Sequence, residues 1–313
     1  MENFIFSAEI VLPLFILIMI GYLLSRVGIF NANFLKTADS VCFRVLLPVL
    51  LFYNIYKCDF MNIVNQKLIT FILIGILVVA FLGVCLVPMI VKNNGRRGTI
   101  IQMLYRGNYL LFGIPICQSI AGDEGAAIAA MIAAILIPVF NIVSVIILSI
   151  FGGRKKVNII SVVGKVLINP LIIAAVLGIA SVVFKIRMPV FVETPVSSIA
   201  GIATPFALLV LGGAFSFKGL FENLLPVIMA SITRLVLIPA IAITCAIYMG
   251  FTNELLAPII VVFASPAAVT SYVMAKEMDA DGELAGQLVV STSFFSIVTL
   301  FVIIYVIRAL GYL

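Results

Sequence analysis

The sequence predicts an all-α integral membrane protein, and three observations support this. Of its 313 residues 64% are hydrophobic and only 10% are charged. The mean hydropathy is +1.31, a value that no soluble domain of this length reaches. The apolar residues also gather in long stretches, and most of these reach the roughly 20 residues that a membrane-spanning helix needs.

Ten such stretches follow one another along the chain. They cover residues 5–24, 38–56, 68–91, 99–120, 125–151, 159–183, 196–217, 224–249, 255–276 and 284–307. The segments between them are too short for a soluble domain. The first stretch has no basic residue ahead of it and no small-residue cleavage site, which favours a retained helix over a signal peptide.

The loops between the stretches indicate the orientation of the chain. If the N-terminus lies outside, the cytoplasmic loops carry more Lys and Arg than the outer loops, as the positive-inside rule requires. The cytoplasmic set is Arg26, Lys36, Lys92, Arg96, Arg97, Arg154, Lys155, Lys156, Lys218 and Lys276, and the outer set is Lys57, Lys67, Lys185 and Arg187. We therefore expect a multi-pass protein of the cell (plasma) membrane with both termini outside. The net charge of +6 then reflects topology and indicates no nucleic-acid partner.

The two halves of the chain share a spacing of prolines and one glycine. Pro13, Gly21 and Pro48 recur 157 residues later as Pro170, Gly178 and Pro205, and Pro88 and Pro115 recur 151 residues later as Pro239 and Pro266. Because each half holds five stretches, an odd number, the second half must be inverted relative to the first. We expect a first repeat at residues 1–151, a short cytoplasmic linker at 152–158 and a second, inverted repeat at 159–313.

Two of these prolines, Pro115 and Pro266, interrupt the fourth and the ninth stretch. A proline removes a backbone donor, and in a bilayer such a break survives only where it is buried in protein or faces a polar cavity. Paired breaks in the two halves of an inverted repeat indicate a ligand site near the bilayer midplane, where the two helices cross. For either proline alone, a simple kink in a packed helix is about as good an explanation.

Polar and small residues flank both expected breaks. Asn108 and Gly113 precede the first, and Ser265 and Thr270 flank the second. The amide of Asn108 can donate to a carboxylate without the cost of burying a charge, and the N-termini of half-helices carry partial positive charge that suits an anion. Asn108 could instead be an interhelical contact, and Ser265 or Thr270 could bond back to its own helix.

Few ionisable residues lie inside the stretches. Arg44 lies eight residues beyond Lys36, roughly 12 Å deep at 1.5 Å per residue. An arginine at that depth must face a cavity, an acid such as Asp39 or an anionic substrate, so Arg44 and Asp39 are also candidates for ion coupling. Arg106 and Arg234 lie nearer to the ends of their stretches, where snorkelling to the interface explains them as well as a function does.

Other chemistry is scarce. The five cysteines are scattered through apolar segments and histidine is absent, so neither a metal site nor a cofactor is predicted. No nucleotide-binding or hydrolase motif is present, which speaks against a membrane enzyme. Asn169 begins the sixth stretch in an Asn-Pro pair, which is either a site contact or a helix cap.

Four motifs resemble those of the auxin efflux carrier family. They are N-x-x-x-x-G-I-P at Asn108–Pro115, A-S-P-A-A-V-x-S-Y-V-x-A-K-E at Ala264–Glu277, N-P at Asn169–Pro170 and L-P-x-L-L-F at Leu47–Phe52. Bacterial members of this family include malate and malonate permeases, and plant members export auxin. The chain lacks the large cytoplasmic loop of the long plant carriers and is similar to the short prokaryotic type.

The resemblance implies a fold and a site. The fold is akin to that of the bile-acid symporters and the bacterial sodium/proton antiporter. In it, helices 1, 2, 6 and 7 form a scaffold, often dimeric, and helices 3–5 and 8–10 form a moving transport domain. The asparagine of the first motif is implicated in substrate binding in the family, which makes Asn108 the leading candidate.

We therefore expect a secondary transporter of a small organic anion that works by alternating access. The expected site comprises Asn108, Gly113, Pro115, Asn169, Ser265, Pro266 and Thr270, with Arg44 setting the charge preference. A proton or sodium gradient could drive transport, and the scaffold helices could form a homodimer. A sodium-coupled carrier of a larger amphipathic or steroid-like anion is the alternative, and a membrane-embedded sensor is a weaker one because no output domain is present.

Overall fold

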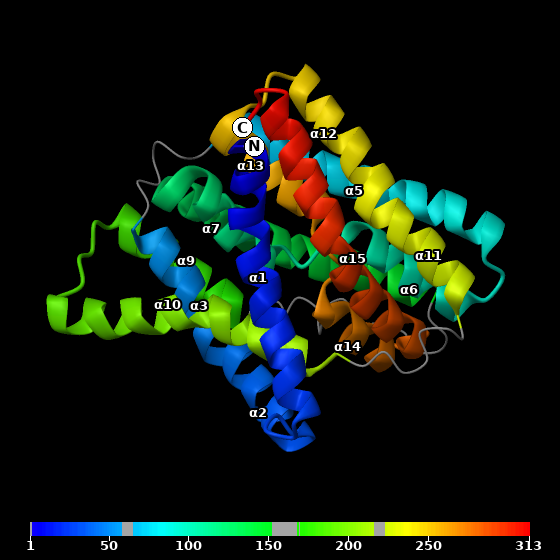
Figure 1. Cartoon of the computed structure of the whole chain (residues 1–313), viewed down its shortest axis with the longest axis horizontal. Helices are drawn as coiled ribbons and strands as arrows, with labels where there is room; N and C mark the ends of the chain where they lie inside the picture. The colour runs from blue at the N-terminus through cyan, green and yellow to red at the C-terminus, as the bar shows by residue number, and fades with distance from the viewer. Residues whose placement is uncertain (1, 58–64, 152–167, 169, 216–222) are drawn as a thin grey trace.

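The computed structural model describes residues 2–57, 65–151, 168, 170–215 and 223–313, and every element within these ranges is a helix (Figure 1). In chain order the helices are α1 (Glu2–Arg26), α2 (Ala32–Val41), η1 (Cys42–Leu46), α3 (Leu47–Tyr56), α5 (Gln66–Ile90), α6 (Asn94–Tyr105), α7 (Tyr109–Phe151), α9 (Pro170–Val183), α10 (Val190–Gly213), α11 (Leu224–Ile232), η2 (Thr233–Leu237), α12 (Ile238–Tyr248), α13 (Asn253–Ala264), α14 (Val269–Glu277) and α15 (Gly282–Ala309). The N- and C-termini lie at the same end of the molecule (Figure 1).

Seven helices in the described part of the chain are long and apolar enough to cross a membrane. They are Glu2–Arg26, Ala32–Tyr56, Gln66–Ile90, Tyr109–Phe151, Val190–Gly213, Leu224–Tyr248 and Gly282–Ala309. The structure therefore confirms an all-helical, multi-pass membrane protein. The predicted number of ten crossings stays a prediction, since α9 and α13 are shorter and much of the sixth stretch lies outside the described residues.

The helix α7 contains a turn. Ala121 and Gly122 depart from helical geometry, and Gly122 has φ of 60°, the left-handed region that glycine adopts without strain. The turn separates a first part of α7, in the predicted fourth stretch, from a second part in the predicted fifth. This explains why one helix of 43 residues replaces two predicted stretches.

Two π-helical turns, η1 and η2, each lie directly ahead of a proline. The amide of Leu47 donates to the carbonyl of Cys42, and that of Ile238 donates to the carbonyl of Thr233. Pro48 and Pro239 follow immediately. A proline lacks the N–H for the normal helical bond and its ring crowds the carbonyl four residues back, so the preceding turn widens.

The helices pack in two sets. α1, α3, α9 and α10 pack mainly on one another, and α5, α6 and α11–α15 form a second set, while α7 and α15 contact both. In the first set, the backbones of α1 and α10 come close together at Gly21 and Gly212. A Cβ atom added at either glycine would lie 1.9 Å from a carbonyl oxygen of the other helix, so both positions must be glycine for the backbones to touch.

Two pairs of helices of equal length begin a nearly constant number of residues apart. α5 begins at Gln66 and α11 at Leu224, a shift of 158 residues, and both continue as helices of 25 residues. α6 and α13 begin at Asn94 and Asn253, a shift of 159 residues, and both have 12 residues.

The predicted shift of 151 residues between Pro88 and Pro239 and between Pro115 and Pro266 is therefore wrong. Pro88 lies near the end of its helix, whereas Pro239 lies in the middle of its own. Packed membrane helices tolerate proline at many positions, so proline spacing alone did not fix the register of the third and fourth stretches.

Candidate functional site

Two broken helices cross near the centre of the second set. The chain leaves helical geometry at Arg106–Asn108, between α6 and α7, and again at Ser265–Ala268, between α13 and α14. The two extended segments pair in antiparallel fashion, with Gly107 opposite Ala267. The amide of Asn108 donates to the carbonyl of Pro266 (2.7 Å), and the amide of Ala268 donates to the carbonyl of Arg106 (3.1 Å). Because the backbone groups exposed at each break form hydrogen bonds with those of the other, both breaks are stable in the protein interior without water.

The second break lies where the sequence placed it, at Pro266, but the first does not lie at Pro115. Pro115 belongs to the helical first part of α7, and the chain breaks eight residues earlier, at Gly107. The reason is that the amide of Asn108 bonds across to Pro266 in place of a carbonyl of its own helix. Gly113 is also helical, and a Cβ there would lie 3.0 Å from the ring of Tyr109, so this glycine makes room for the tyrosine.

The N-terminal ends of α7 and α14 face a cavity of about 140 Å³, called here the crossover cavity. Its lining includes the first residues of α7 (Asn108–Leu111), the first residues of α14 (Ala268–Thr270), Arg106, and the side chains of Phe43, Leu47, Leu136, Ile137, Phe140, Asn141 and Leu171. Helix N-termini carry partial positive charge and free N–H groups. Both half-helices thus present their positive ends to one small space.

Arg106 is the one charged side chain among the described residues that line this cavity. It is 6% exposed, and its guanidinium donates to Asn141 Oδ1 (2.8 Å), Thr270 Oγ1 (3.0 Å) and Ser144 Oγ (3.1 Å). The described part of the chain offers it no carboxylate, since the two ion pairs found there join Lys57 to Glu193 and Arg96 to Asp281. The cavity therefore holds a buried positive charge that neutral groups alone compensate.

Asn108 adds a donor without a partner. Its side chain is 7% exposed, lines the crossover cavity, and its amide nitrogen has no hydrogen-bond partner in the described part of the structure. The hydroxyl of Tyr109 is likewise buried and unpaired. A buried polar group without a partner costs free energy, so both groups have hydrogen-bonding capacity that the described structure does not use.

Comparison with known proteins gives the family of the chain. A family model described as "Membrane transport protein" matches residues 6–304. The chain belongs to this family. The resemblance to the auxin efflux carriers is thereby confirmed, and the assignment to transporters, not enzymes, follows.

Two archaeal relatives cover nearly the whole transporter. An "Uncharacterized transporter" of Methanothermobacter thermautotrophicus is 23% identical over 305 residues, which are 95% of this chain and 97% of the relative. Another "Uncharacterized transporter", from Methanocaldococcus jannaschii, is 22% identical over 308 residues, or 93% of this chain and 96% of the relative. Neither name specifies a substrate.

The other predicted site residues of the transporter fall into different places. Thr270 lines the crossover cavity beside Asn108. Ser265 is buried in the second break, where its carbonyl accepts from Arg234 Nε (3.1 Å), and its hydroxyl has no partner in the described structure. Asn169 lies outside the described residues.

Arg44 does not occupy the predicted position. It lies in η1 but is exposed, because Phe43 and Leu47 take the face of this helix that lines the cavity. Asp39 is also exposed, and although both residues are described, they form no ion pair with each other. Arg44 therefore does not line the crossover cavity, whereas Arg106 does, and the predicted role of Arg44 stays a prediction.

Asp39 instead lines a second cavity, of about 560 Å³, which we call the vestibule. The vestibule lies between η1 and the end of α10 on one side and α14 and α15 on the other, and it carries Lys36, Asp39 and Glu283. It shares Phe43, Leu47, Leu111 and Val269 with the crossover cavity. The shared lining residues place the vestibule next to the crossover cavity.

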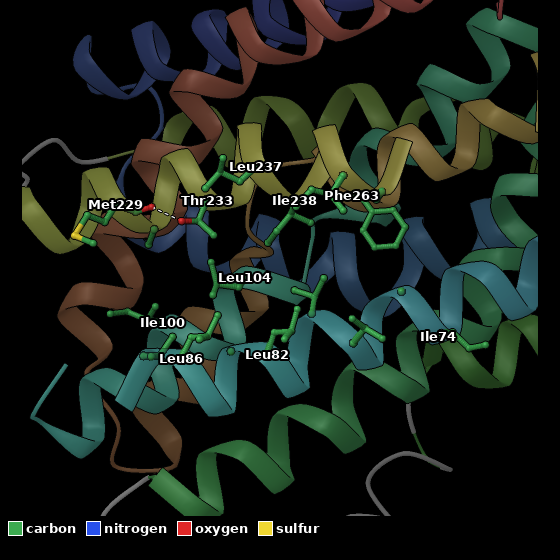
Figure 2. Close-up of a pocket in the computed structure, with 18 of the residues that line it drawn as sticks. Ile74, Leu82, Leu86, Ile100, Leu104, Met229, Thr233, Leu237, Ile238 and Phe263 are labelled. Atoms are coloured by element: carbon green, nitrogen blue, oxygen red, sulfur yellow. Dashed lines mark hydrogen bonds between the residues drawn. The ribbon is translucent and has the colours of Figure 1, made fainter. Parts of the chain in front are cut away.

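A cavity larger than both, of about 1480 Å³, lies elsewhere in the described part of the transporter. It is a groove between α5 and the helix formed by α11, η2 and α12, with Phe263 and Leu104 at its base (Figure 2). Aliphatic side chains such as Ile74, Leu82 and Leu237 form its walls, and all three are exposed or half-buried. Neither Arg106 nor Asn108 lines this groove, so its size does not mark it as the place of the buried polar groups at the crossover.

Sequence reasoning missed three functional candidates. It left Arg106 and Arg234 open between snorkelling and a function, whereas both are buried within the transporter, and it did not consider Asn141. Proximity to the end of an apolar stretch was the misleading signal, since both breaks bring helix ends to the interior. Arg106 directly precedes Gly107 in the sequence. A sequence analysis that placed the break at Gly107 would therefore also have placed Arg106 in the interior.

Proposed function

We propose that the chain is a secondary active transporter that moves a small organic anion by alternating access around the crossover cavity. The observation that carries this proposal is the buried guanidinium of Arg106, whose partners among the described residues are all neutral and which lines one cavity with the positive ends of two half-helices. A carboxylate would neutralise it, and the free amide of Asn108 would complete the site.

The size of the crossover cavity favours a small cargo. At about 140 Å³ it is well below the roughly 300–1,000 Å³ of pockets for drug-sized ligands. A dicarboxylate such as malate or malonate matches it well, and a flat monocarboxylate such as auxin would extend into the vestibule. A steroid-like anion, the alternative raised by the sequence, would not fit without movement of the walls.

Alternating access requires two bodies that move against each other. The packing of α1, α3, α9 and α10 as one set, and of α5, α6 and α11–α15 as another, supports a scaffold and a transport domain with the vestibule between them. The shifts of 158 and 159 residues between matching helices support an inverted repeat of five helices each. The termini at one end of the molecule agree with both being outside the plasma membrane, and a homodimer through the scaffold is part of the same proposal.

Uptake into proteoliposomes tests the proposal. Radiolabelled malate, malonate and indole-3-acetate are supplied with and without a proton or a sodium gradient. We expect saturable uptake of one of them, with an affinity that Asn108→Ala lowers about tenfold. The matched control is Asn54→Ala, because Asn54 also has a buried, unpaired amide nitrogen in the described structure but does not line the crossover cavity.

The outcomes are distinct. An affinity for uptake that is as high in Asn108→Ala as in Asn54→Ala would remove Asn108 from the site. Uptake of none of the three anions under any gradient would contradict the proposed cargo class.

A further inference from the structure

A second buried arginine, Arg234, lies at the crossover but does not line the crossover cavity. It belongs to η2 and is 1% exposed. Its guanidinium donates to three backbone carbonyl oxygens, those of Leu104 (2.7 Å), Val262 (3.0 Å) and Ser265 (3.1 Å). Within the described residues no carboxylate forms an ion pair with it.

These carbonyls are free of helical partners for reasons that the sequence supplies. Val262 would normally accept from residue 266, but that residue is a proline and has no N–H. Leu104 would accept from Asn108, whose amide bonds to the carbonyl of Pro266 instead. The breaks therefore leave orphaned carbonyls at the C-terminal ends of α6 and α13.

The C-terminal ends of helices carry partial negative charge. Unwound carbonyls and half-helix C-termini are the groups that coordinate alkali cations in transporters with broken helices. In this protein the guanidinium of Arg234 occupies the position next to such carbonyls. The fit is close, since a Cβ added at Gly107 would lie 2.2 Å from Nη2 of Arg234.

We infer that Arg234 is a built-in cation that occupies the place of a bound alkali ion, so that the crossover holds its geometry without sodium or potassium at this position. The inference goes beyond the proposed function, because it concerns the negative ends of the half-helices and not the cavity at their positive ends. It holds whatever anion is carried.

Thermal unfolding of the purified protein tests the inference without any substrate. We compare wild type, Arg234→Ala and Arg308→Ala by circular dichroism in sodium, potassium and choline chloride. Arg308 is the control arginine, since its guanidinium lies over the ring of Phe6, 4.0 Å from the ring centroid, away from the crossover. Each protein is also measured with added guanidinium or with added urea, which has a similar shape but no charge.

We expect the Tm of wild type to be the same in all three salts. Arg234→Ala should lower Tm by about 10 °C, because three buried carbonyls lose their donors. Guanidinium at a concentration ten to a hundred times its Kd should raise the Tm of this variant by about 2–4 °C and should not raise that of the other two proteins. Urea should restore nothing.

Three results would overturn the inference. They are a rise of the wild-type Tm that is specific to sodium or potassium, rescue of Arg234→Ala by urea as well as by guanidinium, or no rescue beyond that of Arg308→Ala. If Arg234→Ala does not fold, the Tm of wild type in the three salts still tests the inference. Arg234→Lys is then measured as well, because it keeps the charge and its Tm should not depend on the salt. Failure of uptake in proteoliposomes would leave these results unaffected.

Discussion

The two buried arginines of the crossover are held in different ways. Arg106 lies by the positive ends of α7 and α14, and its partners include the side-chain oxygens of Asn141 and Thr270. Arg234 lies at the negative ends of α6 and α13, and its partners are backbone carbonyls. Side-chain partners can rotate away when a carboxylate arrives, whereas backbone carbonyls at a helix end cannot. The comparison assigns the exchangeable charge to Arg106 and the fixed charge to Arg234.

We expect the largest effect on transport from removing the charge of Arg106, the arginine that lines the crossover cavity. Arg106→Gln should lower uptake or ligand affinity on the order of 100-fold, because the anion would lose its charged partner in a buried site. Uptake in proteoliposomes measures the effect, and thermal unfolding serves as the control for folding. Unchanged uptake in a folded Arg106→Gln would contradict the division of roles.

The second prediction concerns the space around the fixed arginine. Gly107→Ala would place a Cβ atom 2.2 Å from Nη2 of Arg234 and 2.4 Å from Ser265 Oγ. Such overpacking should lower the free energy of unfolding by about 1–3 kcal/mol. The matched control is Gly201→Ala in α10, where nothing lies within 4 Å of the added atom. Equal Tm values for the two variants would show that Arg234 is not packed against Gly107.

A third prediction addresses the unpaired donor of the cavity. Asn108→Ala should weaken binding of the anion by about tenfold, the equivalent of one hydrogen bond of about 1.4 kcal/mol to a charged group. At the same time the protein should not become less stable, because the amide nitrogen has no partner in the described structure to lose. Calorimetric titration of the anion and a measurement of Tm test both halves. A destabilised variant with unchanged affinity would indicate an interhelical role.

We expect the smallest effect on uptake and stability from replacing Pro115, and we compare it with the replacement of Pro266. Pro115→Ala should change uptake little and stability by at most about 1 kcal/mol, because Pro115 lies within a helix. Pro266→Ala should have the larger effect, since its new N–H can bond to Val262 and compete with Arg234. Side-by-side uptake and Tm measurements of the two variants decide. A larger defect in Pro115→Ala would place the functional break at the first proline after all.

The spans and the second break could be predicted from the sequence because they depend on local properties. Apolar stretches determine membrane-spanning helices, and the second break contains a proline, Pro266, that marks it in the sequence. The first break could not be located in this way. Arg106, Gly107 and Asn108 include no proline, and the chain opens there because its amide and carbonyl pair with a segment 160 residues away.

The burial of the arginines could not be predicted from the sequence either. Arg44 and Arg234 each lie in a π-helical turn shortly ahead of a proline, yet one is exposed and the other is 1% exposed. The difference comes from which helices pack against each turn, and hydropathy carries no such information. The predicted role of Asn108 stays a prediction, with its place in the crossover cavity as support.

The central claim is that a small organic anion binds at the positive ends of α7 and α14 through Arg106. Calorimetric titration of malate, malonate and indole-3-acetate into wild type and into Arg106→Gln tests it most directly. The account predicts binding of at least one of them to wild type and a loss of affinity on the order of 100-fold in the folded variant. Equal affinity for both proteins would contradict it.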